Sequence, residues 1–233
     1  MFFEKILDKK SVYCSDNLPD LKHCFTTREV SAECLAGYFE FEPRNLIHPT
    51  QTHSSNVAFA EKGKDDYPET DALILTNYDQ AVYLRFADCT PVILYDKKAN
   101  IAAVAHAGWK GTVASIVTKT VNAMLTYSKS DVTNIYAAIG PAIGVCCYKV
   151  GEEVEKGIKA SVLNADNLII EKEDGIYVDL KKTNARQLIE MGVPETNIDI
   201  CPFCTSCRND LFYSYRKENG TDKRHYAIIK LTK

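Results

Sequence analysis

Apolar runs that resemble β-strands recur along this chain and constrain its fold more than any other feature. Several of them are continuous, as expected of strands with both faces buried, while others alternate apolar and polar residues. The runs are DALILT (71–76), AVYLRFA (81–87), PVILYD (91–96), IAAVAHAG (101–108), NIYAAIG (134–140), IYVDL (176–180) and HYAIIKL (225–231). The chain is therefore expected to bury a substantial amount of β-structure.

Three segments with a helical pattern lie between these runs, at residues 111–128, 151–163 and 181–192. The last ends in Gly192 with Pro194 shortly beyond, which is a helix stop signal. The loose alternation of strands and helices favours an α/β fold with mixed sheets over a strict doubly wound repeat. No linker, repeat or low-complexity tract divides the sequence, so we expect one domain over residues 1–233.

The composition is that of an ordinary globular protein, with 45% hydrophobic and 25% charged residues. The formal net charge of −3 supplies no strong positive field, so we expect no nucleic-acid partner. No apolar stretch approaches the roughly 20 residues of a membrane helix, and the N-terminal MFFEKILDKKSVY is too charged for a signal peptide. We therefore expect a soluble, cytoplasmic protein with no membrane partner. Its nine cysteines are better assigned to metal binding, catalysis or packing than to disulfides.

Reactive side chains stand beside turn-like sequence in three stretches. These are PTQTHSSNV with His53, RFADCTPVI with Asp88 and Cys89, and AVAHAGWKG with His106. Neighbouring strands lie about 4.8 Å apart, so residues at the same ends of adjacent strands can approach ligand distance. Two neutral imidazoles and one thiolate suit Zn²⁺, and three protein ligands leave a fourth position open, as in catalytic sites.

The same side chains have other interpretations. A histidine at a strand end is often a hydrogen-bonded structural residue, and a cysteine in an apolar segment often packs as a small hydrophobe. Cys89 could also form a nucleophilic pair with His53 or His106. Because the spacing of these three residues does not show that they converge, the local sequence leaves the alternatives open.

The stretch CPFCTSC places Cys201, Cys204 and Cys207 at C-x2-C-x2-C spacing, which is similar to iron–sulfur and zinc-knuckle runs. No fourth cysteine follows at the ferredoxin spacing, and Cys146-Cys147 could supply it only if the chain folds back. We therefore expect free thiols in a loop here in preference to a structural metal site.

Two arginines lie beside aromatic or turn residues: Arg28 in FTTRE and Arg216 in FYSYRKENG. Either could bind a phosphate or carboxylate through paired hydrogen bonds, or lie solvated on the surface. Tyr213 and Tyr215 could stack on a base or pack against the protein. Local sequence does not separate these alternatives.

Seven motifs in order make this chain similar to one known family. They are QTH, DALILT, ADCTPVIL, AHAGWKGT, IGPAIGVCCYKVG, a VDL–N–QL helix start, and CT followed by FYSYR. Together they resemble the YfiH family of laccase domain-containing proteins, long called multicopper polyphenol oxidoreductases. The resemblance runs from about residue 25 to the C-terminus. It departs from the family in the shorter 28–50 region, which lacks a glycine pair, and at Lys110, where an arginine is usual.

The resemblance implies a single-domain α/β/β/α layered sandwich with mixed sheets, similar to the toxin deamidases of the cytotoxic necrotising factor type. It also implies a metal site formed by His53, Cys89 and His106, from the Q-x-H, A-D-C and A-H-A-G-W motifs. Zinc is the expected metal, with copper as an alternative because Cu²⁺ outranks Zn²⁺ in intrinsic affinity.

Family members are described as purine nucleoside enzymes, so the resemblance implies phosphorolysis of adenosine, inosine, guanosine or methylthioadenosine, and adenosine deamination. The expected partners are a purine nucleoside and phosphate, bound by a monomer or weak homodimer. In deamination, Asp88 or Asp71 would move protons. The expected catalytic residues are His53, Cys89, His106 and Asp88, and the expected substrate-binding residues are Arg28, Asp71 and Arg216.

Three other functions remain alternatives. A copper-dependent phenol oxidase would need many histidines, and the chain has five, of which two stand in the matched motifs. A metal-free cysteine hydrolase or deamidase could act on a peptide or peptidoglycan precursor with Cys89 as its nucleophile. The site could also be a purely structural metal clip.

Overall fold

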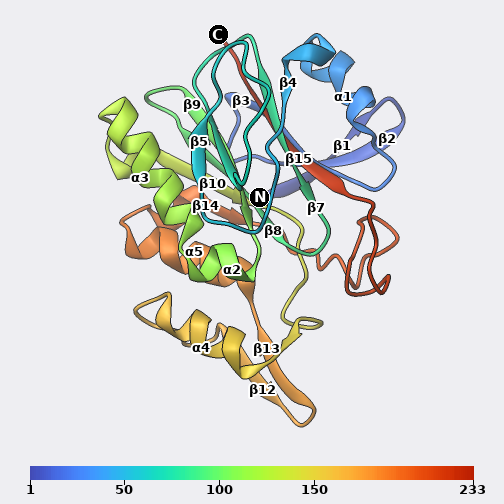
Figure 1. Cartoon of the computed structure of the whole chain (residues 1–233), viewed down its shortest axis with the longest axis vertical. Helices are drawn as coiled ribbons and strands as arrows, with labels where there is room; N and C mark the ends of the chain where they lie inside the picture. The colour runs from blue at the N-terminus through green and yellow to red at the C-terminus, as the bar shows by residue number, and fades with distance from the viewer.

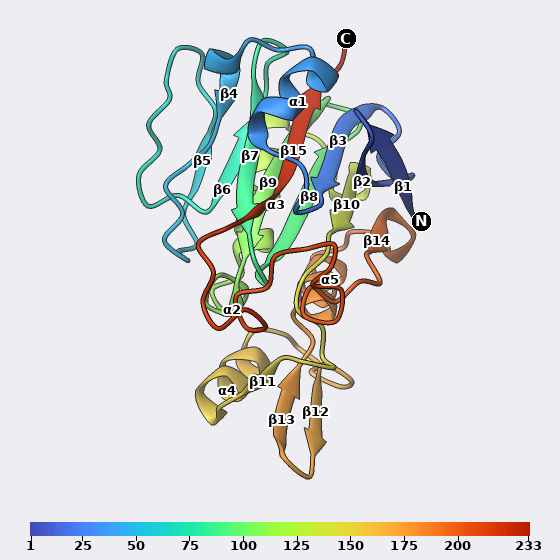
Figure 2. The ribbon, with the colours of Figure 1, turned by 90° about the vertical axis from the view of Figure 1, so that its right-hand side faces the viewer.

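A computed structural model describes the backbone of residues 1–233 and all side chains except those of Ala32, Glu33, Ala36 and Pro43. Two six-stranded sheets lie at its centre (Figures 1 and 2). The first has the order β1 (Phe2–Leu7), β2 (Lys10–Ser15), β3 (Leu21–Thr26), β15 (His225–Leu231), β7 (Ala81–Phe86), β4 (Leu46–Ile47). The second has the order β14 (Ile198–Ile200), β10 (Ile135–Ile139), β8 (Thr90–Asp96), β9 (Ile101–Ala107), β6 (Ala72–Leu75), β5 (Val57–Phe59).

Both sheets are mixed, because they combine antiparallel neighbours with the parallel pairs β4–β7, β5–β6 and β10–β14. A small third sheet has the order β11 (Lys149–Val150), β13 (Gly175–Val178), β12 (Ile169–Lys172). The helices are α1 (Ala32–Phe39), α2 (Trp109–Val113), α3 (Ile116–Ser128), α4 (Glu152–Ala160) and α5 (Leu180–Glu190). In Figure 2 the third sheet and α4 form the lower end of the molecule.

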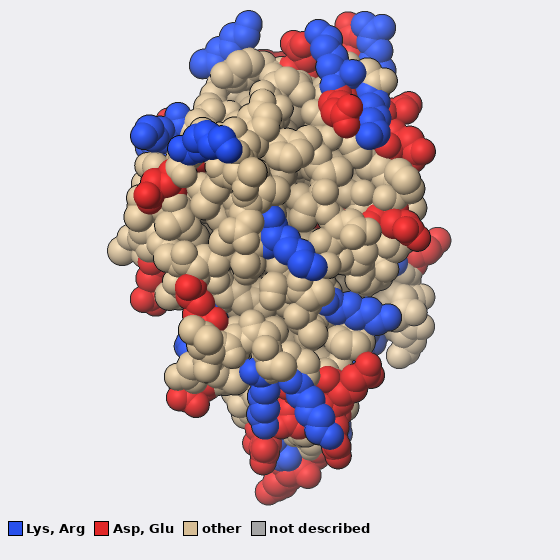
Figure 3. All heavy atoms as spheres, turned by 60° about the vertical axis from the view of Figure 1, so that its left-hand side comes forward, with Lys and Arg blue, Asp and Glu red and all other residues tan. Residues whose placement is uncertain are grey.

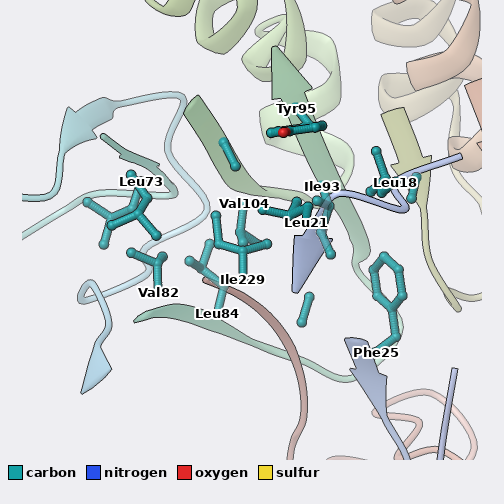
Figure 4. Close-up of a cluster of buried hydrophobic side chains, with 14 of the residues drawn as sticks. Leu18, Leu21, Phe25, Leu73, Val82, Leu84, Ile93, Tyr95, Val104 and Ile229 are labelled. Atoms are coloured by element: carbon teal, nitrogen blue, oxygen red, sulfur yellow. The ribbon is translucent and has the colours of Figure 1, made fainter. Parts of the chain in front are cut away.

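The main core lies between the two six-stranded sheets. Figure 4 shows side chains of both sheets meeting there, among them Val82 and Leu84 from β7, Ile93 from β8, Val104 from β9 and Ile229 from β15. All of these side chains are fully buried. Removing such an apolar surface from water contributes about 25 cal/mol per Å², so this inner layer is the main source of stability.

Helices cover the outer faces of the two sheets. Leu35 and Phe39 of α1 pack with Ile228 on the first sheet, and Val117 and Val121 of α3 pack on the second. The order of layers is therefore helix, sheet, sheet, helix. The predicted α/β/β/α sandwich with mixed sheets is confirmed; its likeness to the toxin deamidases stays a prediction.

All seven predicted strands are present, and one predicted helix is wrong. The single helix expected over 111–128 is two helices, α2 and α3, separated by Ala114 and Ser115. Ser115 has a left-handed backbone (φ 56°), which interrupts the helical hydrogen bonding and redirects the chain. As a result α3 packs on β9, whereas α2 contacts α4.

Most of the first sheet was not predicted from sequence. β1 has four exposed residues in a row, so it carries no apolar pattern, and β4 has only two residues. The first of these segments gains its strand conformation from pairing with β2 along all six residues. Such pairing partners cannot be read from either segment alone.

Charged residues of both signs are distributed over the surface. Figure 3 shows Lys and Arg beside Asp and Glu at both ends of one face, with a wide uncharged area between them. Within the part of the chain that the structure describes, no helix is both long and apolar enough to span a bilayer.

Gly140 tests how tightly the inner layer is packed. A Cβ at this position would overlap the ring of Phe25 and lie 2.9 Å from Cγ of Pro91. We expect Gly140→Ala to lower the free energy of unfolding by about 1–3 kcal/mol, measured by urea denaturation. Gly37→Ala in α1, where no described atom lies within 4 Å of the added Cβ, is the control and should not destabilise the protein.

Candidate metal centre and its pocket

The β8–β9 hairpin brings Cys89 next to His106. Cys89 directly precedes β8, and the antiparallel register pairs Pro91 with His106 and Thr90 with Ala107. His53 reaches the same point from the loop between β4 and β5, where it has a left-handed backbone (φ 60°). The ligand atoms of the two histidines and the cysteine all lie within 4.8 Å of one another. These three residues, called the His–Cys–His cluster below, therefore converge.

The buried carboxylate of Asp71, directly before β6, organises this cluster. One oxygen lies 2.7 Å from Nδ1 of His106 and accepts a hydrogen bond from the backbone N–H of His53 at 3.1 Å. The other accepts from the backbone N–H groups of Thr52 and Ser54 and from the Ser54 hydroxyl. With Nδ1 of His106 engaged, Nε2 of the same ring is the nitrogen left to face a metal, as in carboxylate–histidine–zinc arrangements.

The charges of the cluster stabilise one another in the absence of a metal. Burial by itself would raise the pKa of Asp71, but hydrogen bonds from His106 and Ser54 outweigh it and lower that pKa to about 2. Burial also opposes charge on Cys89 and His106. Their mutual attraction outweighs it, lowering the pKa of Cys89 to about 6 and raising the pKa of His106 to about 9. The cluster thus favours a thiolate, the form of cysteine that binds metals.

Gly108 explains the glycine that follows His106 and Ala107. A Cβ on this residue would lie 3.0 Å from Sγ of Cys89 and 3.2 Å from Cδ2 of His53. Only a residue without a side chain leaves room for both groups. Gly108 is also the N-cap of α2, so the helix begins beside the cluster.

The cluster lies at the wall of a cavity of about 680 Å³. Three arginines line it: Arg85, Arg216 and Arg224. Arg216 donates to the carbonyl of Lys149 at 3.0 Å, and its guanidinium lies 5.4 Å from the ring centre of Tyr148. The remaining lining residues are His48, Pro49, Thr50, Gln51, Ala87, Asp88, Ile143 and Tyr215.

Asp88 connects the cavity wall to two distant segments. Its carboxylate accepts hydrogen bonds from the Thr205 hydroxyl at 2.6 Å and from the backbone N–H of Arg216 at 2.7 Å. Its carbonyl accepts from the backbone N–H of Ile143. Asp88 therefore lines the cavity, while Asp71, which was expected to bind substrate, is fully buried and contacts the cluster instead.

Arg28 lies outside the set of described residues that line the cavity. Its guanidinium donates to the carbonyl of Asn209, lies 3.9 Å from Glu218 and stacks over the ring of Tyr213. The substrate-binding position expected of Arg28 is therefore corrected: its contacts join the N-terminal segment to the 209–218 loop. Tyr213 packs there too, whereas Tyr215 faces the cavity.

Sequence reasoning missed Arg85, Arg224 and Tyr148 as cavity residues. Arg85 is an exposed residue on the otherwise largely buried strand β7, a signal that the local pattern did carry. Tyr148 and Arg224 follow turns, and no local pattern shows which way these turns face.

A second group of sulfur atoms lies in the loops beside the cavity. Cys146, Cys147, Cys204 and Cys207 have their sulfurs within 4.8 Å of one another. The chain therefore does fold back, and the expectation that these thiols are unconnected loop residues is corrected. Cys201 does not belong to this group, because it is buried in the protein beside Lys181.

The comparisons with known proteins agree with this arrangement. The family model described as multi-copper polyphenol oxidoreductase laccase matches residues 23–232. The chain belongs to this family. Purine nucleoside phosphorylase YlmD of Geobacillus stearothermophilus is 34% identical over 206 residues, which cover 84% of this chain and 75% of the relative. Purine nucleoside phosphorylase SACOL1200 of Staphylococcus aureus is 35% identical over 205 residues, which cover 84% and 76%.

Two solved structures share the fold. The hypothetical protein YfiH of Bacillus licheniformis superposes with a TM-score of 0.91 at 27% identity, covering 97% of this chain and 98% of that one. YlmD from Geobacillus stearothermophilus superposes with a TM-score of 0.88 at 27% identity, covering 94% of each chain. The resemblance drawn from the seven motifs is thereby confirmed.

Asp71→Asn tests the carboxylate that orients the cluster. The variant keeps the shape but loses the negative charge and part of the acceptor capacity that His106 and the 52–54 loop use. We expect zinc affinity to fall about 10–100-fold, measured by competition with a chromophoric chelator. Asp79→Asn, at an exposed surface carboxylate, is the control, and equal affinities in the two variants would contradict the assignment.

The reactivity of Cys89 in metal-free protein should depend on pH in an unusual range. With a pKa of about 6, the thiolate forms as the pH rises from 5 to 7, so alkylation should accelerate there and then level off. An ordinary thiol, with a pKa of about 8.5, keeps accelerating at higher pH. Peptide mass spectrometry after timed iodoacetamide labelling measures this. His106→Gln should move the midpoint upward, since the imidazolium stabilises the thiolate.

Proposed function

We propose that the chain is a zinc-dependent purine nucleoside phosphorylase. The observation that carries the proposal is the convergence of the His–Cys–His cluster at the wall of a cavity that also presents three arginines. A volume of about 680 Å³ suits a nucleoside with phosphate, since small-molecule pockets span about 300–1,000 Å³. The relatives named purine nucleoside phosphorylase support the same substrate class.

The cavity offers groups for both substrates of phosphorolysis. In this reaction a phosphate oxygen bonds to C1′ while the C1′–N9 bond breaks, and the bonding electrons leave with the purine. Arg85, Arg216 and Arg224 would hold the phosphate through charge-assisted hydrogen bonds. Tyr148 and Tyr215 would pack against the purine ring. Adenosine, inosine, guanosine and methylthioadenosine share the bond that is cleaved.

His53, Cys89 and His106 would hold the zinc ion. One thiolate and two imidazoles are a donor set that suits zinc, and the hydrogen bond from Asp71 to His106 fixes the ring for coordination. When bound, zinc supplies Lewis-acid chemistry at the position that three protein ligands leave open.

The histidine content favours one metal ion over several copper ions. The chain has five histidines, and two of them belong to the cluster. His23 and His225 are buried elsewhere in the core, and His48 lies on the cavity wall without joining the cluster. Oxidation by several coppers would need more imidazoles at the site.

Adenosine deamination is the second candidate activity. Asp88 favours it, because this carboxylate lines the cavity beside Cys89 and could carry protons between water and the purine. Asp71 is the weaker candidate for that task, since its oxygens are buried and already accept hydrogen bonds from the 52–54 loop and His106.

We also propose that the enzyme works in the cytoplasm. All nine cysteines are free, and each of their side chains is among those the structure describes. Unpaired thiols persist in reducing compartments.

The decisive experiment is chromatography of adenosine incubated with the purified enzyme, with and without phosphate. We expect adenine and ribose 1-phosphate only when phosphate is present, and inosine in either case if deamination also occurs. Cys89→Ala should abolish both products, while Cys34→Ala, at a cysteine of α1, serves as control. If neither product forms with zinc-loaded enzyme, the proposed function is wrong. Activity that persists without metal would favour Cys89 as a nucleophile.

Arg85→Ala tests the phosphate site. Losing a hydrogen bond to a charged group should raise KM for phosphate about tenfold or more, with a smaller effect on KM for adenosine. Arg44→Ala is the matched control, because Arg44 pairs with Glu42 at the surface and is not a lining residue. Equal changes of both constants in Arg85→Ala would contradict this role.

A further inference from the structure

Four cysteine sulfurs from two loops lie in the arrangement of a metal site. Cys146 and Cys147 belong to the loop between β10 and β11, and Cys204 and Cys207 to the loop after β14. The sulfur of Cys207 lies 3.6 Å from that of Cys146 and 3.5 Å from that of Cys147. Tetrahedral zinc with Zn–S bonds of about 2.3 Å separates its sulfurs by about 3.8 Å. The spacing therefore suits a shared metal ion.

We propose that Cys146, Cys147, Cys204 and Cys207 bind a structural zinc ion, separate from the His–Cys–His cluster. Thiolates are soft ligands that select zinc, and four of them close the coordination sphere, so this ion would have no position for substrate. The sulfur separations are far longer than the roughly 2.05 Å of a disulfide bond.

The backbone around these cysteines is already arranged for the site. The N–H of Gly144 donates to Sγ of Cys204 at 3.1 Å, a hydrogen bond that stabilises a thiolate. A Cβ on Gly144 would lie 3.2 Å from Sγ of Cys146, so glycine lets the chain approach closely. A β-bridge joins Ala142 to Cys204, and Thr205 donates to the carbonyl of Ala142 at 3.0 Å. The two loops thus meet through backbone contacts before any metal binds.

The proposed zinc would fix one wall of the substrate cavity. Tyr148 follows Cys147 directly and lines the cavity, and Thr205 follows Cys204 and donates to the carboxylate of Asp88. Figure 2 shows the long segment after β14 passing close to the segment that leads into β11. Tying these loops together would hold Tyr148 and Asp88 in place without touching the His–Cys–His cluster.

Metal counting tests the proposal independently of the enzymatic function. Protein purified without added metal is analysed for zinc by mass spectrometry of the digested sample. We expect two zinc ions per chain in the wild type, one after Cys146→Ser/Cys207→Ser, and one after His53→Ala/Cys89→Ala. Cys34→Ser, which removes a thiol on α1, should keep both. If the first double variant retains the full zinc content, the four-cysteine site is wrong, whatever the nucleoside assay shows.

A labelling experiment on the wild-type chain avoids any folding defect of the variants. Cys146 and Cys207 are exposed, so without a metal they should react readily with iodoacetamide. Zinc should slow their labelling at least tenfold and chelator should restore it, while partly buried Cys34 labels equally in both states. Equal labelling of Cys146 and Cys207 with and without zinc would overturn the proposal. So would a disulfide among the four cysteines, or iron in place of zinc.

Discussion

One buried carboxylate, that of Asp71, positions the groups on which the candidate metal centre depends. It accepts hydrogen bonds from the loop that carries His53 and from the ring of His106, so two of the three candidate ligands share an anchor. A buried charge is costly unless it is fully hydrogen-bonded. The same contacts that satisfy this carboxylate therefore set the loop conformation and the orientation of the ring.

Asp88 has a comparable role in the wall of the cavity. It joins the end of β7 to Thr205 and Arg216 through its carboxylate and to Ile143 through its carbonyl. The four cysteines connect the same two segments a few residues further along. The substrate cavity is thus formed by loops that contribute little to the core but are fixed to it and to one another.

Much of the fold could be predicted because β8 and β9 are buried on both faces and therefore read as continuous apolar runs. Pairing of Cys89 with His106 followed from the hairpin between them. The left-handed Ser115 that divides the long predicted helix could not be predicted, since serine adopts this conformation only where the tertiary structure requires it. Arg28 was misplaced because an arginine beside an aromatic residue looks the same in a binding site and in a structural contact.

By itself, the sequence determined the layered α/β architecture, the family and the chemical types of the candidate ligands, since these depend on local patterns and ordered motifs. Only the tertiary structure decided that His53 meets Cys89 and His106, that Asp71 is an orienting group, and that Cys146 and Cys147 lie beside Cys204 and Cys207. These contacts join loops far apart along the chain. Their closeness arises from strand pairing and loop packing across the whole fold, which no local pattern encodes.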